Sequence, residues 1–282
     1  MVKTVSRIDL LRKSIGQARS AGKSIGFVPT MGFLHDGHYS LIDRARRDNG
    51  LVVVSIFVNP MQFGPSEDLA AYPRNLPGDS SGCMKHGTDL LFLPQEDAVY
   101  PKGFSTSVEV SGISETLCGK SRPGHFRGVA TVVLKLFNLV QPDRAYFGLK
   151  DFQQFLVISR MVRDLDLNLE VIGCPTVREP DGLARSSRNV YLTPEQRRES
   201  CRISKALFQA RDDVKKGEAQ AINIKAMIEK HITLIPDSRI DYISICDADS
   251  LEELEKIDRR AVVLVACHVG KARLIDNILL NP

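Results

Sequence analysis

The clearest indication of the fold is the stretch IGFVPTMGFLHDGH at positions 25–38. It opens with an apolar run, Ile25 to Val28, which is typical of a buried strand and is ended by Pro29. A helix is expected from about Tyr39 to Asp48, after a short loop that contains two glycines. A buried strand, a loop and a helix in this order begin a strand–helix–strand unit, so the stretch favours a parallel sheet.

The same alternation continues along the chain. Further strands are expected at 51–58, 89–93, 144–147 and 169–174. The helices between and before them are expected at 6–21, 129–140 and 152–165. Because the strands are continuous apolar runs, we expect a parallel sheet that is covered on both faces, which is an α/β fold.

The pattern changes after Tyr191. Two charged helices, at about 194–215 and 219–231, precede strands expected at 240–246, 261–268 and 272–276. This order predicts a smaller α+β domain at the C-terminus. The boundary should lie in the loop at 177–190, so we divide the chain into domains 1–182 and 183–282.

Composition narrows the class of protein. The chain has 282 residues, of which 43% are hydrophobic and 26% charged, and a net charge of +4 without a basic stripe, so no nucleic-acid partner is expected. No run approaches the roughly 20 apolar residues that span a bilayer, so no membrane partner is expected. The six cysteines include no C-x-x-C pair, and the N-terminus has no signal-peptide pattern. The simplest location is the cytoplasm.

The loop after the first strand carries two histidines. Gly32 and Gly37 let a ligand approach the backbone, and the N-terminus of the following helix offers N–H groups to a phosphate. His35 and His38 could then stabilise charge on a reacting phosphate or donate a proton to a leaving pyrophosphate. A lone histidine more often caps a helix or packs. The spacing His-x-Gly-His directly after a buried strand favours the phosphate interpretation, and the chain has no P-loop motif.

Three further segments carry polar side chains at loops or strand ends. In GLARSSRN, at 182–189, two hydroxyls lie between two guanidinium groups, as in a mobile loop that closes on a triphosphate. In FGLKDFQQ, at 147–154, the lysine could reach a phosphate. In VNPMQF, at 58–63, Asn59 and Gln62 are neutral hydrogen-bonding groups that could hold a small polyol acid.

Taken in order, these segments resemble the pantothenate synthetases. The similarity also includes YPR at 72–74, RPGHFRGV at 122–129 and ARLIDN at 272–277, so it runs through nearly the whole chain. The resemblance implies a Rossmann-like N-terminal domain that holds ATP and pantoate, with the C-terminal α+β domain as a lid. It also implies a homodimer, a Mg²⁺ requirement and a two-step joining of pantoate to β-alanine through pantoyl adenylate.

The resemblance implies roles for single residues as well. His38 corresponds to the histidine assigned as proton donor, Gln62 to the glutamine that contacts pantoate and β-alanine, and Gln154 to the second pantoate contact. The implied ATP contacts are Met31, Gly32, Phe33, Leu34, His35, Asp36, Gly37, His38, Gly148, Leu149, Lys150, Asp151, Val177, Arg185, Ser186, Ser187 and Arg188.

This chain departs from the family pattern at three positions. Leu149 stands where many members have Glu, and Arg185 where many have Met or Leu, so these two side chains could contact ATP differently or not at all. Asp79 is the candidate Mg²⁺ ligand, but a neighbouring acid found in some members is Gly78 here.

Other functions remain open at this stage. Another nucleotidyltransferase would share the histidine motif but should lack the set Asn59, Gln62 and Gln154 and the segment from Arg122 to Val129, both of which this chain has. A metal-dependent hydrolase would use His35 and His38 as ligands, and it would need further His or carboxylate ligands at neighbouring strand ends. A third possibility is a nucleotide sensor without turnover.

Overall fold

The computed structural model describes residues 2–65 and 67–281. The chain divides into two compact units. The first comprises the described residues up to Ser114 together with Arg122–Leu149 and Gln154–Pro175. The second comprises Glu115–Ser121, Lys150–Gln153 and the described residues from Thr176 onward. The main division falls at Thr176, before the predicted boundary between residues 182 and 183, and the second unit also takes two short segments from earlier in the chain.

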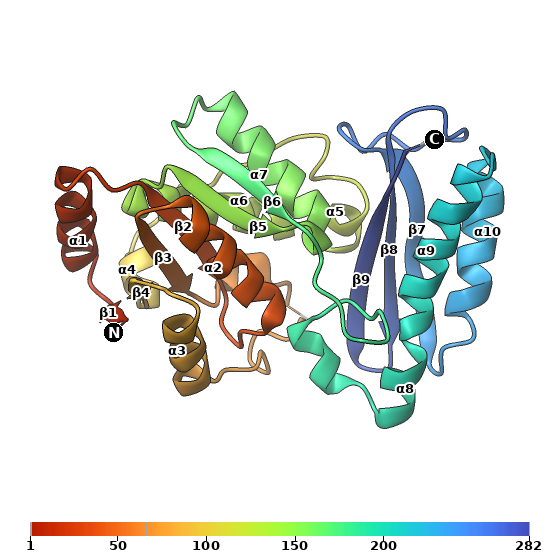
Figure 1. The fold of residues 1–282 in the computed structure, drawn as a ribbon, viewed down its shortest axis with the longest axis horizontal. Helices are drawn as coiled ribbons and strands as arrows, with labels where there is room; N and C mark the ends of the chain where they lie inside the picture. The colour runs from red at the N-terminus through yellow and green to blue at the C-terminus, as the bar shows by residue number, and fades with distance from the viewer. Residues whose placement is uncertain (1, 66, 282) are drawn as a thin grey trace. The chain divides into compact units, whose positions relative to one another are not determined.

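The first unit is built on a parallel sheet in the strand order β1-β4-β3-β2-β5-β6 (Figure 1). Its strands are β1 (Lys3–Val5), β2 (Ile25–Thr30), β3 (Leu51–Ile56), β4 (Leu90–Phe92), β5 (Arg144–Gly148) and β6 (Glu170–Cys174). All five adjacent pairs are parallel. The predicted Rossmann-like α/β fold is therefore confirmed. Strand β1 was not predicted, because only Val5 among its three residues is buried.

Side chains of successive strand residues enter two different cores. Phe27 and Val53 belong to one buried cluster, whereas Val28 and Val54 belong to the other. Successive residues of a strand point to opposite faces, so both faces of the sheet are covered. The long helices are α1 (Ile8–Ser20), α2 (Asp36–Asp48), α3 (Leu76–Lys85), α6 (His125–Val140) and α7 (Phe152–Asp164), with a short α4 (Glu96–Val99).

The strand order places a ligand site between β2 and β5. Strands β3 and β4 lie on one side of β2, and β5 and β6 lie on the other, so the order reverses at this point. In open α/β sheets, ligands bind outside the carboxyl ends of the strands at such a reversal. The two segments that leave these ends are the histidine loop after Thr30 and the turn after Gly148.

The second unit is an antiparallel sheet covered by helices. Its strands β7 (Ser238–Asp247), β8 (Ala261–Val269) and β9 (Ala272–Leu280) pair in chain order. Its helices are α5 (Cys118–Ser121), α8 (Pro194–Glu199), α9 (Cys201–Lys215) and α10 (Ala221–Ile232), of which α9 and α10 lie beside the sheet (Figure 1). Leu207 of α9 and Ile228 of α10 belong to one buried cluster with residues of all three strands. The single helix predicted at 194–215 is divided near Ser200, whose backbone leaves α8 and enters α9.

Candidate active site

The two histidines form the N-terminus of α2. The helix begins at Asp36, before the predicted Tyr39, because His35 is its N-cap and His38 lies in its first turn. The Nδ1 atom of His35 accepts from Gly37 N at 3.1 Å, and Nδ1 of His38 accepts from His35 N at 3.3 Å. An Nδ1 that accepts carries no hydrogen, so each neutral ring has its proton on Nε2. Both histidines therefore cap the helix, and each has an Nε2–H that can donate.

Asp79 holds the histidine loop. Its carboxylate accepts from the backbone N–H groups of Phe33 at 2.8 Å and Leu34 at 2.7 Å, and the residue is 3% exposed. Phe33 has a φ of 51°, in the left-handed region that non-glycine residues rarely adopt. A Cβ at Gly32, whose φ is 88°, would lie 3.2 Å from Asp79 Oδ2. The buried carboxylate thus fixes an unusual turn.

A Mg²⁺ site was predicted at Asp79. Both of its carboxylate oxygens already accept hydrogen bonds from backbone N–H groups. Within residues 2–65 and 67–281, no cluster of three or more His, Cys, Asp or Glu side chains could hold a metal ion. Those residues therefore do not form a metal cage by themselves. Mg²⁺ at nucleotide sites is commonly held by one or two carboxylates together with substrate phosphates, and the residues here fit only that arrangement.

Gln62 is oriented by a buried amide. It ends the short 3₁₀ helix η1 (Pro60–Gln62) after β3. Asn59 Nδ2 donates to Gln62 Oε1 at 3.1 Å and to Gly128 O at 3.1 Å, while Asn59 Oδ1 accepts from Tyr100 Oη at 2.8 Å. These bonds fix the amide orientation of Asn59 and aim the Nε2 group of Gln62 at Met31, whose sulfur it contacts at 3.0 Å. Gln62 therefore presents hydrogen-bond donors beside the histidine loop.

A second network holds the backbone of Gln62. Its carbonyl is 2.9 Å from His125 Nδ1, and His125 Nε2 is 3.0 Å from Arg122 Nη1. A carbonyl only accepts and a guanidinium only donates, so His125 is neutral with its proton on Nδ1. Arg122 also forms a forked pair with Glu67, at 2.5 and 2.7 Å. Burial would raise the pKa of Glu67, but the hydrogen bonds and charge of Arg122 outweigh burial and hold that pKa below its ordinary value of 4.5.

Close packing leaves little space around this part of the site. A Cβ at Gly128 would lie 2.3 Å from Met61 O and 2.7 Å from Gln62 N, so no larger residue fits there.

Leu149 lies over β6, because a Cβ at Gly173 would come within 2.7 Å of its side chain. Gln154, the second predicted pantoate contact, is half-buried on α7.

The second unit contains the serine–arginine loop. Ser186 caps the 3₁₀ helix η3 (Ser187–Tyr191) by accepting from Arg188 N at 3.3 Å. Val177 O accepts from Arg185 N at 3.0 Å, and the Arg185 guanidinium is 3.1 Å from Glu179. Arg185 is thus paired with a carboxylate at the base of the loop, so the departure from the family pattern at this position has a local structural partner.

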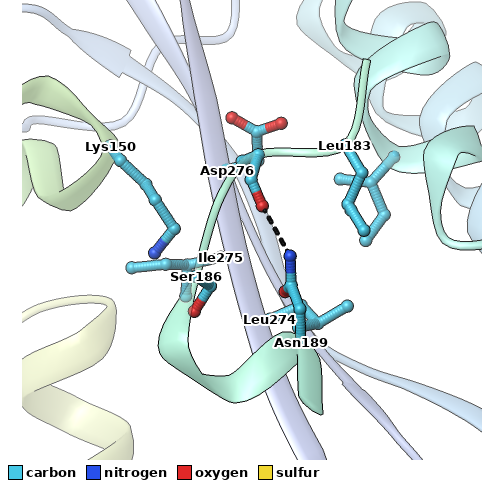
Figure 2. Close-up of a pocket in the computed structure, with 9 residues that line it drawn as sticks. Lys150, Leu183, Ser186, Asn189, Leu274, Ile275 and Asp276 are labelled. Atoms are coloured by element: carbon cyan, nitrogen blue, oxygen red, sulfur yellow. Dashed lines mark hydrogen bonds between the residues drawn. The ribbon is translucent and has the colours of Figure 1, made fainter. Parts of the chain in front are cut away.

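A small pocket of about 10 Å³ lies beside this loop (Figure 2). Its polar lining includes Lys150, Ser186, Asn189 and Asp276. Asn189 Nδ2 donates to Ala184 O at 3.1 Å, which is the dashed line in Figure 2. Two segments that are distant in the chain and were both predicted to bind ATP therefore lie together within this unit.

Several site-forming residues were not assigned roles from the sequence. Glu67, Arg122 and His125 hold Gln62, and Arg178 and Asp276 form a forked pair at 2.6 and 2.9 Å near the serine–arginine loop. The only available signal was that Arg122, His125 and Asp276 lie in segments quoted for the resemblance.

In the part of the chain that the structure describes, no helix is both long and apolar enough to cross a membrane.

Comparison with known proteins agrees with this geometry. The family model described as pantoate-beta-alanine ligase matches residues 3–279. A pantothenate synthetase of Moorella thermoacetica is 56% identical over 274 residues, which cover 97% of each chain. One of Thermotoga neapolitana is 53% identical over 280 residues, covering 99% of this chain and 100% of the relative.

Solved structures show the same relationship. The pantothenate synthetase of Thermus thermophilus matches with a TM-score of 0.95 and 47% identity over 100% of both chains. A pantoate-beta-alanine ligase of Francisella tularensis, described as complexed with beta-gamma ATP and β-alanine, matches with a TM-score of 0.80 and 36% identity over 99% of this chain and 98% of that one. With a family model that matches nearly its whole length, this chain belongs to the pantoate-beta-alanine ligase family.

Proposed function

We propose that this protein condenses pantoate with β-alanine at the expense of ATP, through a pantoyl-adenylate intermediate. The observation that carries the proposal is the N-terminus of α2, where the rings of His35 and His38 lie 4.2 Å apart, centre to centre, on the loop that leaves β2 at the reversal point of the sheet. The family of the chain and the nucleotide and β-alanine bound to the Francisella relative support it.

In the first step, the pantoate carboxylate attacks the α-phosphate of ATP and pyrophosphate leaves. His38 and His35 donate from Nε2 to phosphate oxygens, which offsets the negative charge that develops there. The N-terminus of α2 adds the positive end of the helix dipole. When bound with ATP, Mg²⁺ would neutralise phosphate charge.

Gln62 and Gln154 hold pantoate for this attack. Gln62 Oε1 accepts from Asn59, which turns the Nε2 group, the only donor of the side chain, away from Asn59 and leaves it to donate to a carboxylate or hydroxyl oxygen of pantoate. In the second step the β-alanine amine attacks the acyl carbon, AMP leaves, and the amide forms with loss of a proton. Gln62 would also contact β-alanine, as the family resemblance implies.

Lys150, Ser186, Ser187 and Arg188 are assigned to the triphosphate. Lysine and arginine supply charge-assisted hydrogen bonds, and the hydroxyls donate to phosphate oxygens. We further propose that the second unit acts as a lid that excludes water from the acyl adenylate, whether its main part begins at the predicted residue 183 or at Thr176. A homodimer and a cytoplasmic location belong to the same proposal, and sedimentation and cell fractionation would test them.

Oxygen-18 transfer tests the chemistry. Pantoate labelled in its carboxylate should pass one labelled oxygen to AMP, because the bond between the carboxylate oxygen and the α-phosphate survives when the acyl carbon is attacked. Label in inorganic phosphate, with ADP as the other product, would show an acyl-phosphate route and overturn the proposal.

A further inference from the structure

Two neighbouring residues of β9 bind both ATP-assigned segments of the second unit. Asp276 is connected to the serine–arginine loop through Arg178, and Asn277 is bonded to Lys150. Both side chains are buried, with exposed fractions of 3% and 8%. Successive strand residues point to opposite faces, so the two side chains reach different segments.

The connection through Asp276 is a forked ion pair. Arg178 Nη1 and Nη2 donate to the two carboxylate oxygens at 2.6 and 2.9 Å, and Nη1 also donates to Gly182 O at 3.1 Å. The guanidinium lies 5.1 Å from the centre of the Phe208 ring on α9. Planar, two-point contacts of this kind fix orientation as well as distance. The start of the loop is therefore anchored to the sheet and to α9.

The connection through Asn277 is a single hydrogen bond to the backbone. Its Nδ2 donates to Lys150 O at 2.8 Å, so it fixes the main chain from which the Lys150 side chain enters the pocket of Figure 2. Ser186 reaches the same pocket from the loop. The separation between Lys150 and Ser186 thus depends on two adjacent residues of a single strand.

We propose that Asp276 and Asn277 are a positioning pair, which sets the spacing between Lys150 and the serine–arginine loop to match the triphosphate of ATP. This inference rests on the proposed adenylation. Neither residue contacts the nucleotide in this account. They act through the segments that they hold, so their loss should weaken ATP use and leave pantoate use unchanged.

The test compares ATP and pantoate kinetics in variants of the full chain. Asn277→Asp keeps the shape but cannot donate to Lys150 O, and Asn277→Ala removes the bond altogether. Misplacing a binding group by about 1 Å costs on the order of 10²-fold, so we expect kcat/KM for ATP to fall by about 10- to 10²-fold with KM for pantoate unchanged. Ile228→Val, a cavity variant in the buried core of the same unit, is the control and should leave KM for ATP unchanged.

A second pair of variants separates positioning from stability. Asp276→Asn leaves Arg178 buried without its anion, whereas the double variant Arg178→Met with Asp276→Leu removes both charges and should recover stability. If the pair positions the loop, the double variant keeps a raised KM for ATP although it is as stable as the parent chain. Recovery of normal ATP kinetics together with stability would overturn the proposal.

Measuring ATP binding directly separates the test of the positioning pair from the test of the proposed function. Calorimetric titration with ATP alone should show the same loss of affinity in Asn277→Asp and Asn277→Ala, whether or not the parent chain forms pantothenate. If the parent chain binds ATP without turnover, the proposed function fails and the positioning proposal still stands or falls on the titration. Unchanged ATP affinity in both Asn277 variants would refute the positioning pair.

Discussion

The pantoate side of the site and the serine–arginine loop are held in different ways. Around Gln62, buried groups from several separate segments fix both the side chain and the backbone carbonyl. In the loop, the base is anchored by Arg178, whereas Ser186 bonds within its own turn, to Arg188 N. From this contrast we expect the first unit to present a preformed surface to its substrates. We expect the base of the loop to stay anchored through Arg178, and its outer part, around Ser186 and Arg188, to adopt its working position when ATP binds.

The largest effect is expected from the preformed part, at His38. His38→Ala removes the Nε2–H donor that we assign to phosphate, and losing one such donor typically costs about 10²- to 10³-fold in rate. His35→Ala should cost less. The measurement is the single-turnover rate of adenylation, with circular dichroism and thermal unfolding as the control, because each variant also loses a helix-capping bond worth about 1 kcal/mol. Full activity per folded molecule would show that the histidines are structural.

Arg188 tests whether the serine–arginine loop changes its position when ATP binds. The charge-assisted hydrogen bonds that we propose between Arg188 and phosphate are worth about 1.5–3 kcal/mol, so Arg188→Ala should lower the adenylation rate by roughly 10- to 10²-fold. Amide hydrogen exchange at 181–189 should slow when ATP is added to the parent chain and slow further with pantoate, and Arg188→Ala should remove most of that protection. Exchange that does not respond to ATP would refute the lid.

Loss of Gln62 or Gln154 should impair the use of pantoate and not the binding of ATP, which is the opposite of what we expect for Arg188. Each acts by neutral hydrogen bonds, so Gln62→Ala and Gln154→Ala should raise KM for pantoate several-fold to about tenfold, with ATP binding nearly unchanged. Steady-state kinetics with each substrate varied in turn checks this. If both variants lost ATP affinity to the same extent as pantoate affinity, the site would not be divided in this way.

The ion pair between Glu67 and Arg122 should make the free energy of unfolding depend on pH. The pKa of Glu67 in the folded chain lies below the ordinary value of 4.5, so the ion pair with Arg122 stabilises the fold fully above pH 4.5 and loses this contribution as the pH falls through the folded pKa. Glu67→Gln should lower the free energy of unfolding by about 1.5 kcal/mol near pH 7. Urea unfolding should show this difference shrinking below pH 4.5, and a constant difference across that range would contradict the assignment.

Arg185 should have the smallest effect. Its guanidinium is paired with Glu179 and is one-third exposed, and ion pairs of this kind contribute about 0–1 kcal/mol. Arg185→Ala should therefore change activity only slightly, in contrast to Arg188→Ala in the same loop. A loss as large as that of Arg188→Ala would show that Arg185 turns to phosphate when ATP binds.

Much of the first unit could be predicted because its strands are continuous apolar runs, as at Ile25 to Val28. The start of α2 was placed three residues late, since histidine is not among the usual capping residues and its capping bonds do not show in a sequence. The anchoring pairs were not predictable from spacing. Glu67 and Arg122 are separated by 55 positions, and Arg178 and Asp276 by 98, so only the folded chain brings each pair together.

Exchange of labelled pyrophosphate into ATP tests the central claim most directly. If the preformed surface binds pantoate and its carboxylate attacks the α-phosphate, label should enter ATP only when pantoate is present, and β-alanine should not be needed. Label that enters ATP without pantoate, or that fails to enter when pantoate is supplied to a chain that binds ATP, would contradict the account.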